Sequence, residues 1–202
     1  MAEGIVQVTE GAGKKLHTWN RTIGANSIED EFTLPGEFPY ATYSVIAGQV
    51  STATANSHLI EIMAGATLPV RIRRISVIQT AAPGAVTLSQ LQLFRLTTAG
   101  TGGTVVTPQK YDNADAASGA TCMTLAAVKG ANGAQLWERP FMYGTAAIPP
   151  GALSIWNWEQ LPNEKPIIIP AGATNGIAIQ NPVAVAVATV GITIEFVETN
   201  FV

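Results

Sequence analysis

The chain has 202 residues, of which 47% are hydrophobic and only 12% are charged, and its formal net charge is −3 at pH 7. Globular proteins usually carry about 25% charged residues, so much of this surface must be small and polar or covered by partner chains. The negative charge argues against a nucleic-acid partner, because such proteins usually present a basic surface. No apolar run approaches the roughly 18 residues that cross a membrane, so no membrane is expected as a partner.

The N-terminal segment 1–10 contains Glu3 and Glu10 and lacks a long apolar stretch, so no signal peptide is expected. The single cysteine, Cys122, rules out a disulfide bond within the chain. Burial of apolar residues and hydrogen-bonded strands must therefore hold the fold together, which fits synthesis in a reducing cytoplasm.

Residues 1–40 differ from the rest of the chain, because they combine scattered charges and glycines with a weak hydrophobic periodicity. Segments 5–8 and 16–23 could pair as strands. They could equally belong to an extended segment that folds only against a neighbouring chain. We therefore expect residues 1–40 to form an N-terminal arm that contacts its neighbours, and residues 41–202 to form the folded domain.

The string LPVRIRRISVI has the pattern of a strand whose alternation breaks once in the middle. Val70 and Ile72 share one face, and after the break Ile75 and Val77 form the apolar set. Both sets can face one side of a sheet only if an extra residue is inserted near 73–74, which is a β-bulge. Bulges bend strands, as the corners of β-sandwiches and barrels require.

Further strands are predicted where β-branched or alternating apolar residues lie between turns rich in Gly and Pro. They span residues 43–49, 58–64, 88–96, 104–107, 136–143, 153–158, 165–169, 176–180 and 190–197. The only helical element expected is one short turn within 122–129. Short strands separated by such turns over this length indicate an all-β sandwich or barrel.

Few residues offer chemistry. His17, His58 and Cys122 lie far apart in the sequence and lack the ligand spacing of a metal site. His58 opens a predicted strand, and we expect it to be solvated or hydrogen-bonded at a sheet edge or interface. A catalytic cysteine needs a nearby base, so Cys122 is expected to be a small core residue. The sequence therefore predicts no catalytic residue, no metal site and no cofactor.

Asp112, Asn113 and Asp115 resemble the first residues of a calcium-binding loop. The glycine and glutamate that should follow them are missing. An Asx-rich turn is therefore the favoured interpretation of this segment.

The candidates for an interface are Arg71, Arg73, Arg74, Trp156 and Trp158. The arginines, together with Arg95, could pair with acidic groups of a neighbouring chain or sheet, Glu61 among them, or form a solvated stripe. Trp156 and Trp158 share one face of a strand, where they could belong to the core, seal a subunit interface or stack on sugar rings.

Several strings resemble a family of tailed-bacteriophage virion proteins over about residues 58–197. They are HLIEIMAG at 58–65, PVRIRRI at 69–75, RLTTAGTGGT at 95–104 and KPIIIPAG at 165–172. The string VTEGAGK at 8–14 resembles the opening of phage structural proteins. The motifs are structural, so the resemblance transfers no functional residues.

The resemblance implies a capsid cement or decoration protein with a jelly-roll-like β-sandwich, located on the virion surface after synthesis in the bacterial host. Its expected partners are the major capsid protein and its own copies, as a homotrimer. The alternative is a receptor- or glycan-binding jelly-roll module of the phage tail or head surface, with Trp156 and Trp158 exposed. An enzyme such as a cupin-like barrel is the least favoured class, because its metal ligands are missing from the sequence.

Overall fold

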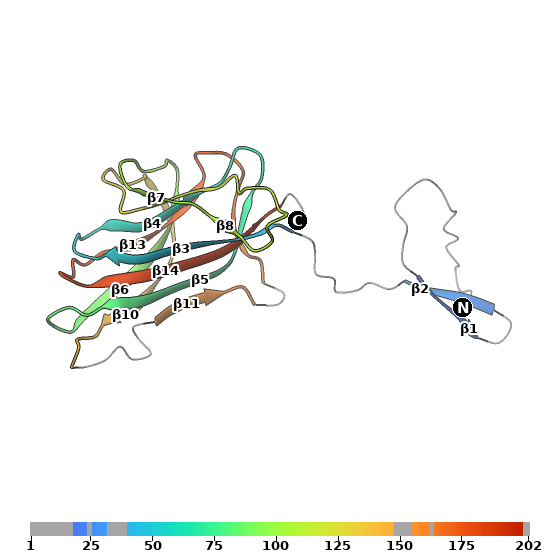
Figure 1. Ribbon diagram of the computed structural model, residues 1–202, viewed down its shortest axis with the longest axis horizontal. Coiled ribbons are helices and arrows are strands. Elements are labelled where there is room, and N and C mark those ends of the chain that lie inside the picture. Colours follow the sequence, from blue (N-terminus) through green and yellow to red (C-terminus); the bar gives the residue numbers. More distant parts are fainter. Residues whose placement is uncertain (1–17, 24–25, 32–39, 148–154, 162–163, 200–202) are drawn as a thin grey trace. The chain divides into compact units, whose positions relative to one another are not determined.

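The computed structural model describes residues 18–23, 26–31, 40–147, 155–161 and 164–199 (Figure 1). The chain divides into two compact units, Met1–Pro39 and Tyr40–Val202. In the first unit, β1 (Thr18–Ile23) pairs antiparallel with β2 (Asn26–Glu31). The partner of the strand expected at 16–23 is thus 26–31, whereas segment 5–8 lies outside the described residues.

The second unit consists of two antiparallel sheets packed face to face, so the all-β sandwich expected from the sequence is confirmed (Figure 1). Sheet 1 has the strand order β11 (Ile155–Glu159), β5 (Val70–Ala81), β14 (Thr189–Glu198), β3 (Thr42–Ser51) and β8 (Gln109–Lys110), and β12 (Ile167–Ile169) also pairs with β5. Sheet 2 has the order β10 (Asn132–Tyr143), β6 (Thr87–Leu96), β13 (Gly176–Asn181), β4 (Ser57–Met63), β9 (Thr121–Thr124) and β7 (Thr104–Val106).

The longer strands pair as a set of nested hairpins. β3 pairs with β14, β4 with β13, β5 with β11 and β6 with β10, and the chain changes sheet at most connections between these strands. Residues that are distant in the sequence are therefore neighbours in each sheet.

The bulge predicted in β5 is present and lies at Arg73. Along the pairing with β14, Arg74 lies opposite Glu195 and Ile72 lies opposite Phe196, so Arg73 is the extra residue. As a result Val70, Ile72, Ile75 and Val77 are all buried, although their spacing in the sequence changes phase.

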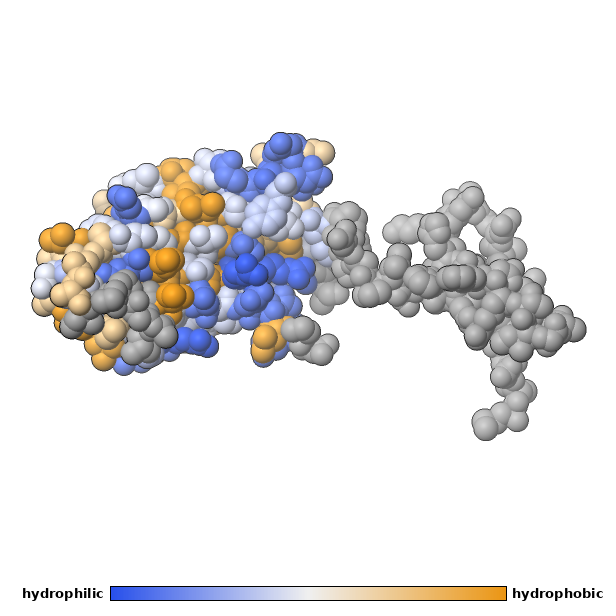
Figure 2. Space-filling view, turned by 60° about the horizontal axis from the view of Figure 1, so that its bottom comes forward, coloured by the Kyte–Doolittle hydropathy of each residue, from blue (hydrophilic) through white to orange (hydrophobic). Residues whose placement is uncertain are grey.

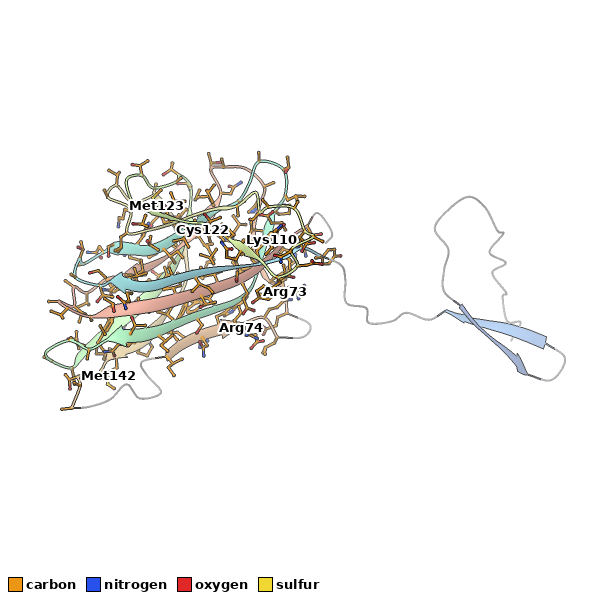
Figure 3. All side chains as sticks on the ribbon, in the orientation of Figure 1. Arg73, Arg74, Lys110, Cys122, Met123 and Met142 are labelled. Atoms are coloured by element: carbon orange, nitrogen blue, oxygen red, sulfur yellow. The ribbon has the colours of Figure 1, made fainter. Side chains whose placement is uncertain are left out.

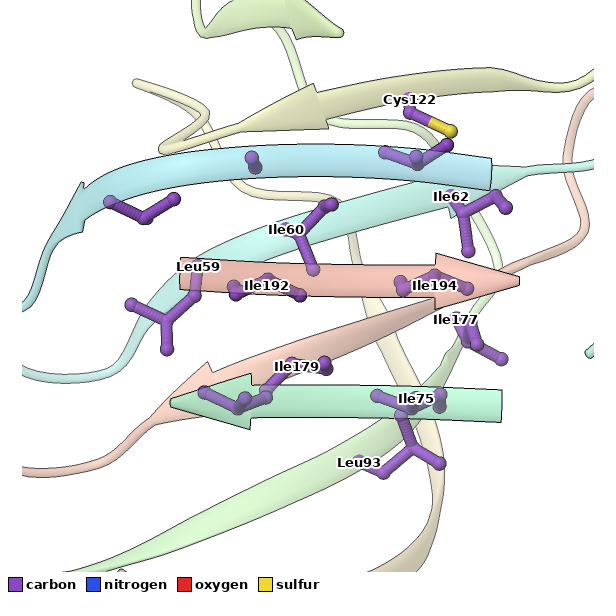
Figure 4. Packing of buried hydrophobic residues seen from close by; sticks show 14 of the residues in the cluster. Leu59, Ile60, Ile62, Ile75, Leu93, Cys122, Ile177, Ile179, Ile192 and Ile194 are labelled. Carbon is purple, nitrogen blue, oxygen red and sulfur yellow. The ribbon is translucent and has the colours of Figure 1, made fainter. Parts of the chain in front are cut away.

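The core lies between the two sheets and is formed mainly by Ile, Leu and Val side chains. Figure 4 shows Leu59, Ile60 and Ile62 of β4 among side chains of both sheets, including Ile192 and Ile194 of β14. A continuous apolar layer of this kind supplies most of the stabilisation of a sandwich.

The described residues contain no helix, so the helical turn expected within 122–129 is wrong. Residues 121–124 instead form β9, which pairs with β4 and β7. β8 and β9 were not predicted as strands, because both are short and lie within a region rich in glycine and polar residues.

Candidate interaction surface

The outer face of sheet 1 changes character from one end to the other. The strand register places its residues in three parallel rows. The first row is Glu159, Arg74, Glu195 and Ser44, and the second is Asn157, Ser76, Thr193 and Ile46. The third row is Ile155, Ile78 and Gly191. The first row is mainly charged, the second mainly carries hydroxyl and amide groups, and the third is apolar. Figure 2 shows hydrophobic surface over the middle and left of the domain and the strongest hydrophilic area to the right.

In the charged row, Arg74 lies between two carboxylates of its own sheet. Its guanidinium is 3.0 Å from Glu159 and 3.6 Å from Glu195. The hydrogen bond to Glu159 and the negative charge of Glu195 raise the pKa of Arg74. Because the pair with Glu159 is exposed, its contribution to stability is small. The sequence left open whether the acidic partner of Arg74 belongs to a neighbouring chain or to a neighbouring sheet. In the structure its acidic partners lie on the adjacent strands of the same sheet.

The other arginines occupy different environments. Arg73 is exposed at the bulge, and Arg71 is half-buried. Arg95 lies on sheet 2, where it donates a hydrogen bond to the carbonyl of Ile168 and its partial burial lowers its pKa. None of these arginines pairs with Glu61 among the described residues, because Glu61 is held by other groups.

Three apolar residues of this face are well exposed. Ile46, Ile78 and Ile155 are 65%, 47% and 50% exposed. Gly191 lies beside Ile78 in the register, so no side chain shields that residue from the β14 side. Ile155 and Ile78 in the third row, with Ile46 in the second, therefore give this face exposed apolar surface on regular strands, which favours contact with another protein.

The tryptophan pair belongs to the domain interior, and the interface expectation for Trp156 is wrong. Trp156 is only 2% exposed, and its ring lies 4.2 Å from that of Trp137 in sheet 2. Trp158 is half-buried and packs against the same core. Since the inner face of β11 is covered by sheet 2, this strand presents Ile155, not its tryptophans, to solvent.

A buried hydrogen bond between a histidine and a carboxylate lies on the opposite side of the molecule, in β4 of sheet 2. The Nδ1 of His58 donates to Glu61 at 2.7 Å, and both side chains are almost completely buried. The same carboxylate accepts hydrogen bonds from the backbone N–H groups of Gly100 at 2.7 Å and Gly130 at 2.8 Å. His58 is hydrogen-bonded, which confirms one of its two expected states, but it lies in a central strand, so its expected place at a sheet edge or interface is wrong.

Glu61 fastens two loops, 97–103 and 125–131, to the outer face of sheet 2. Burial raises the pKa of Glu61, but the hydrogen bonds from His58, Gly130 and Gly100 outweigh it, so the pKa is lowered. A Cβ at Gly100 would lie 2.6 Å from the carboxylate, so only glycine allows this approach. The sequence signal for this feature was an acidic residue inside an otherwise apolar strand.

Cys122 lies in the core, and the acidic loop forms a hydrogen-bonded turn. Cys122 is buried in the core as expected, and burial raises the pKa of its thiol to about 12. Asp112 forms an Asx turn by accepting from the N–H of Ala114, and the ammonium of Lys110 donates to the carbonyls of Asn113 and Asp115. The described residues contain no cluster of His, Cys, Asp and Glu that could hold a metal ion. His17 lies outside the described residues.

Comparison of the chain with protein-family models, with curated proteins and with solved structures found no match. Within the part of the chain that the structure describes, no helix is long and apolar enough to span a membrane.

Proposed function

We propose that this chain is a structural protein of a tailed-bacteriophage virion, a cement or decoration protein that binds across neighbouring capsid subunits. The observation that carries the proposal is the exposed apolar set Ile46, Ile78 and Ile155 on the outer face of sheet 1. A regular sheet that leaves such residues open is typical of a surface covered by another protein. The resemblance of the sequence to phage virion proteins supports the choice of partner.

The form of the sandwich that we propose is a jelly roll. In a jelly roll, one long hairpin of strands is wound around a core, so its strands pair from the outermost to the innermost. The pairs β3–β14, β4–β13, β5–β11 and β6–β10 follow that rule. Jelly rolls are frequent among capsid and lectin domains. The fold therefore supports a virion protein but does not distinguish between the functions that such a protein can have.

The proposed mechanism is mechanical. The apolar row contacts the major capsid protein, and the ion pairs around Arg74 lie at the rim, where they set orientation more than affinity. A contact of standard size buries about 1,600 Å² in total. Many copies on one shell act together, because a copy bound at one junction holds the neighbouring capsid subunits in position for the binding of the next copy.

The glycan-binding alternative required Trp156 and Trp158 to stack on sugars from an exposed face. Trp156 is buried against Trp137, so the pair has no such face. No other observation favours that function.

The experiment is cryo-electron microscopy of particles made with and without this chain. Additional density at junctions between capsid subunits, lost in particles without the chain, is the expected result. Particles whose surface is identical in the two preparations contradict the proposal.

Variants then test the surface. Particles made with I78D/I155D should lose most of this density, while V105D, a change at an exposed residue of β7 in sheet 2, should leave full occupancy. Full occupancy by I78D/I155D would refute the role of sheet 1. Deleting residues 2–30 tests the arm, because the truncated chain should fold but fail to bind heads.

A further inference from the structure

Two arginines of β5, Arg71 and Arg73, have no polar partner within the described part of the chain. The side chain of neither forms a hydrogen bond or an ion pair there. The other described arginines of the sandwich are occupied, Arg74 by two carboxylates, Arg95 by a carbonyl and Arg139 by the ring of a tryptophan. The two unpaired charges on β5 are therefore available to groups outside this chain.

The side chain of Arg71 is half-buried, and its Nε is buried without a hydrogen-bond partner. The backbone at this position is fixed, because β5 pairs here with Val197 of β14 on one side and with Ile168 of β12 on the other. Removing a guanidinium from water without pairing it is unfavourable. A carboxylate brought by a partner compensates for this partial burial, and no described group of the chain does so.

Arg73 is the extra residue of the bulge in β5, and its side chain is exposed. On one edge of β5 the bulge lies between β11, whose last pair is with Arg74, and β12, whose first pair is with Ile72. The N–H of Gln160 donates to the carbonyl of Arg73 at 2.9 Å and so fixes the bulge at the end of β11. Bulges often direct a side chain to a particular place. Here the bulge presents a cation to solvent on backbone that needs no rearrangement on binding.

The surroundings of these arginines carry both signs of charge. Arg74 is bound by two glutamates, and Glu164 and Lys165 lie in the connection that leads to β12. An extended polyanion, such as a nucleic acid or an anionic lipid surface, would bring phosphates against these carboxylates as well. Separate carboxylates of a folded protein can meet the arginines and avoid the glutamates. Arginine suits such a partner, because its planar fork donates two parallel hydrogen bonds to one carboxylate.

The arginines are close enough to the exposed isoleucines to share one interface with them. Arg71 lies between two buried residues of β5, so it shares the outer face of sheet 1 with Ile78, and Figure 3 shows Arg73 and Arg74 side by side on the same strand. Arg71 and Ile78 are seven positions apart. At about 3.3 Å per residue they are about 20 Å from each other. A standard interface buries about 800 Å² per partner, which is a patch about 30 Å across.

We infer that the partner of sheet 1 presents carboxylates that bind Arg71 and Arg73, beside an apolar surface that contacts Ile78 and Ile155. The inference rests on the proposed function, in which that partner is a capsid subunit, and adds the chemistry of its contact surface. Burial of the isoleucines provides affinity, while the arginines fix the register of the two surfaces and make binding depend on salt.

The test is the binding of the purified full-length chain to particles made without it, with occupancy measured by cryo-electron microscopy. At about 0.05 M salt, the dissociation constant of R71Q/R73Q should be about 10–100-fold higher than that of the native chain, and the difference should shrink at about 0.5 M salt. R73Q alone should show a smaller effect of the same kind. R139Q is its matched control, because Arg139 is also exposed but lies on β10 of sheet 2, and it should bind like the native chain.

Chemical modification of the particles tests whether the bound group is a carboxylate. Carbodiimide and methylamine convert exposed carboxylates to neutral amides and leave phosphates of nucleic acid or lipid in place as anions. The native chain and R71Q/R73Q should bind the treated particles equally. A difference between them that persists on treated particles would assign the arginines to another anion and overturn the inference.

The remaining outcomes separate the inference from the proposed function. Native occupancy by R71Q/R73Q at every salt concentration, together with loss of binding by I78D/I155D, would refute the inference and leave the proposed function standing. Absence of binding by the native chain would refute both. R71Q/R73Q should also keep the native unfolding midpoint and the native mass in light scattering. A lower midpoint would assign the arginines to the fold, and a lower mass would assign them to a contact between copies, and either result would overturn the inference.

Discussion

Replacing Glu61 by Gln tests whether a buried carboxylate fastens the two loops that cover sheet 2. In the native chain Oε1 accepts from His58 and Gly130, and Oε2 accepts from Gly100. The amide of Gln has one acceptor oxygen and one NH₂ donor. In either orientation the NH₂ faces a backbone N–H, at Gly100 or at Gly130, and one buried donor loses its partner.

The expected loss follows from these contacts. A hydrogen bond to a charged group contributes about 1.5–3 kcal/mol, and an unpaired buried donor costs about 1–3 kcal/mol. We therefore expect E61Q to lower the free energy of unfolding by about 3 kcal/mol, which is about 6–12 °C in Tm for a domain of this size. Denaturant unfolding measures the loss, and hydrogen exchange should show weaker protection of the Gly100 and Gly130 amides.

The pH dependence gives a second measure of the same contact. Because the pKa of Glu61 is lower in the folded state, its contribution is fully present above the unfolded pKa of about 4.3 and is lost as the pH falls through the folded pKa. The part of the difference between the native chain and E61Q that depends on the Glu61 carboxylate should thus shrink below about pH 4.

Glu138 provides the control. It also accepts hydrogen bonds, from Gln92 and Gln135, but it is exposed. E138Q should change the free energy of unfolding by no more than about 0.5 kcal/mol. If E61Q loses no more stability than E138Q and keeps both glycine amides protected, the fastening role of Glu61 is refuted.

Three further outcomes are expected. Deleting Arg73 removes the bulge and turns Ile75 and Val77 outward, which should lower the free energy of unfolding by about 3–6 kcal/mol. A variant that unfolds like the native chain would contradict the role of the bulge. Burial raises the pKa of Cys122 to about 12, so its thiol should react with a thiol reagent at pH 8 only after unfolding. The free energy of unfolding should fall above about pH 8.5, because the thiol ionises there in the unfolded chain. Rapid labelling of the native chain would be incompatible with this burial. R74A should leave the midpoint of denaturant unfolding nearly unchanged because the ion pairs of Arg74 are exposed, and a clear fall of that midpoint would show that they matter.

The strands of the sandwich could be predicted from the sequence because their signal is local. Alternation with a period of two residues marked most of the strands, and its single phase change marked the bulge at Arg73. The same pattern identified Val70, Ile72, Ile75 and Val77 as core residues. Each inference needed only neighbouring residues, since the pleat of a strand fixes which side chains share a face.

The pair His58 and Glu61 shows why the sites were harder to predict from the sequence than the strands. Residues three apart on a regular strand point to opposite faces. The pairing of β4 with β13 shifts at Leu59, so both side chains reach the same face. The local sequence pattern does not indicate that shift, because β4 carries apolar residues on both faces. Likewise, the burial of Trp156 depended on Trp137, which comes from another sheet.

The amino-acid order alone therefore determined an all-β chain, its main strands, the bend in β5 and the shortage of charge. Tertiary structure decided where that shortage is concentrated. The segments 52–56, 82–86 and 182–188 are unremarkable loops in the sequence, and strand pairing alone gathers them at one end. The reason is physical, because hydrogen-bonded pairing between distant strands depends on the whole sheet and not on the residues of any one loop.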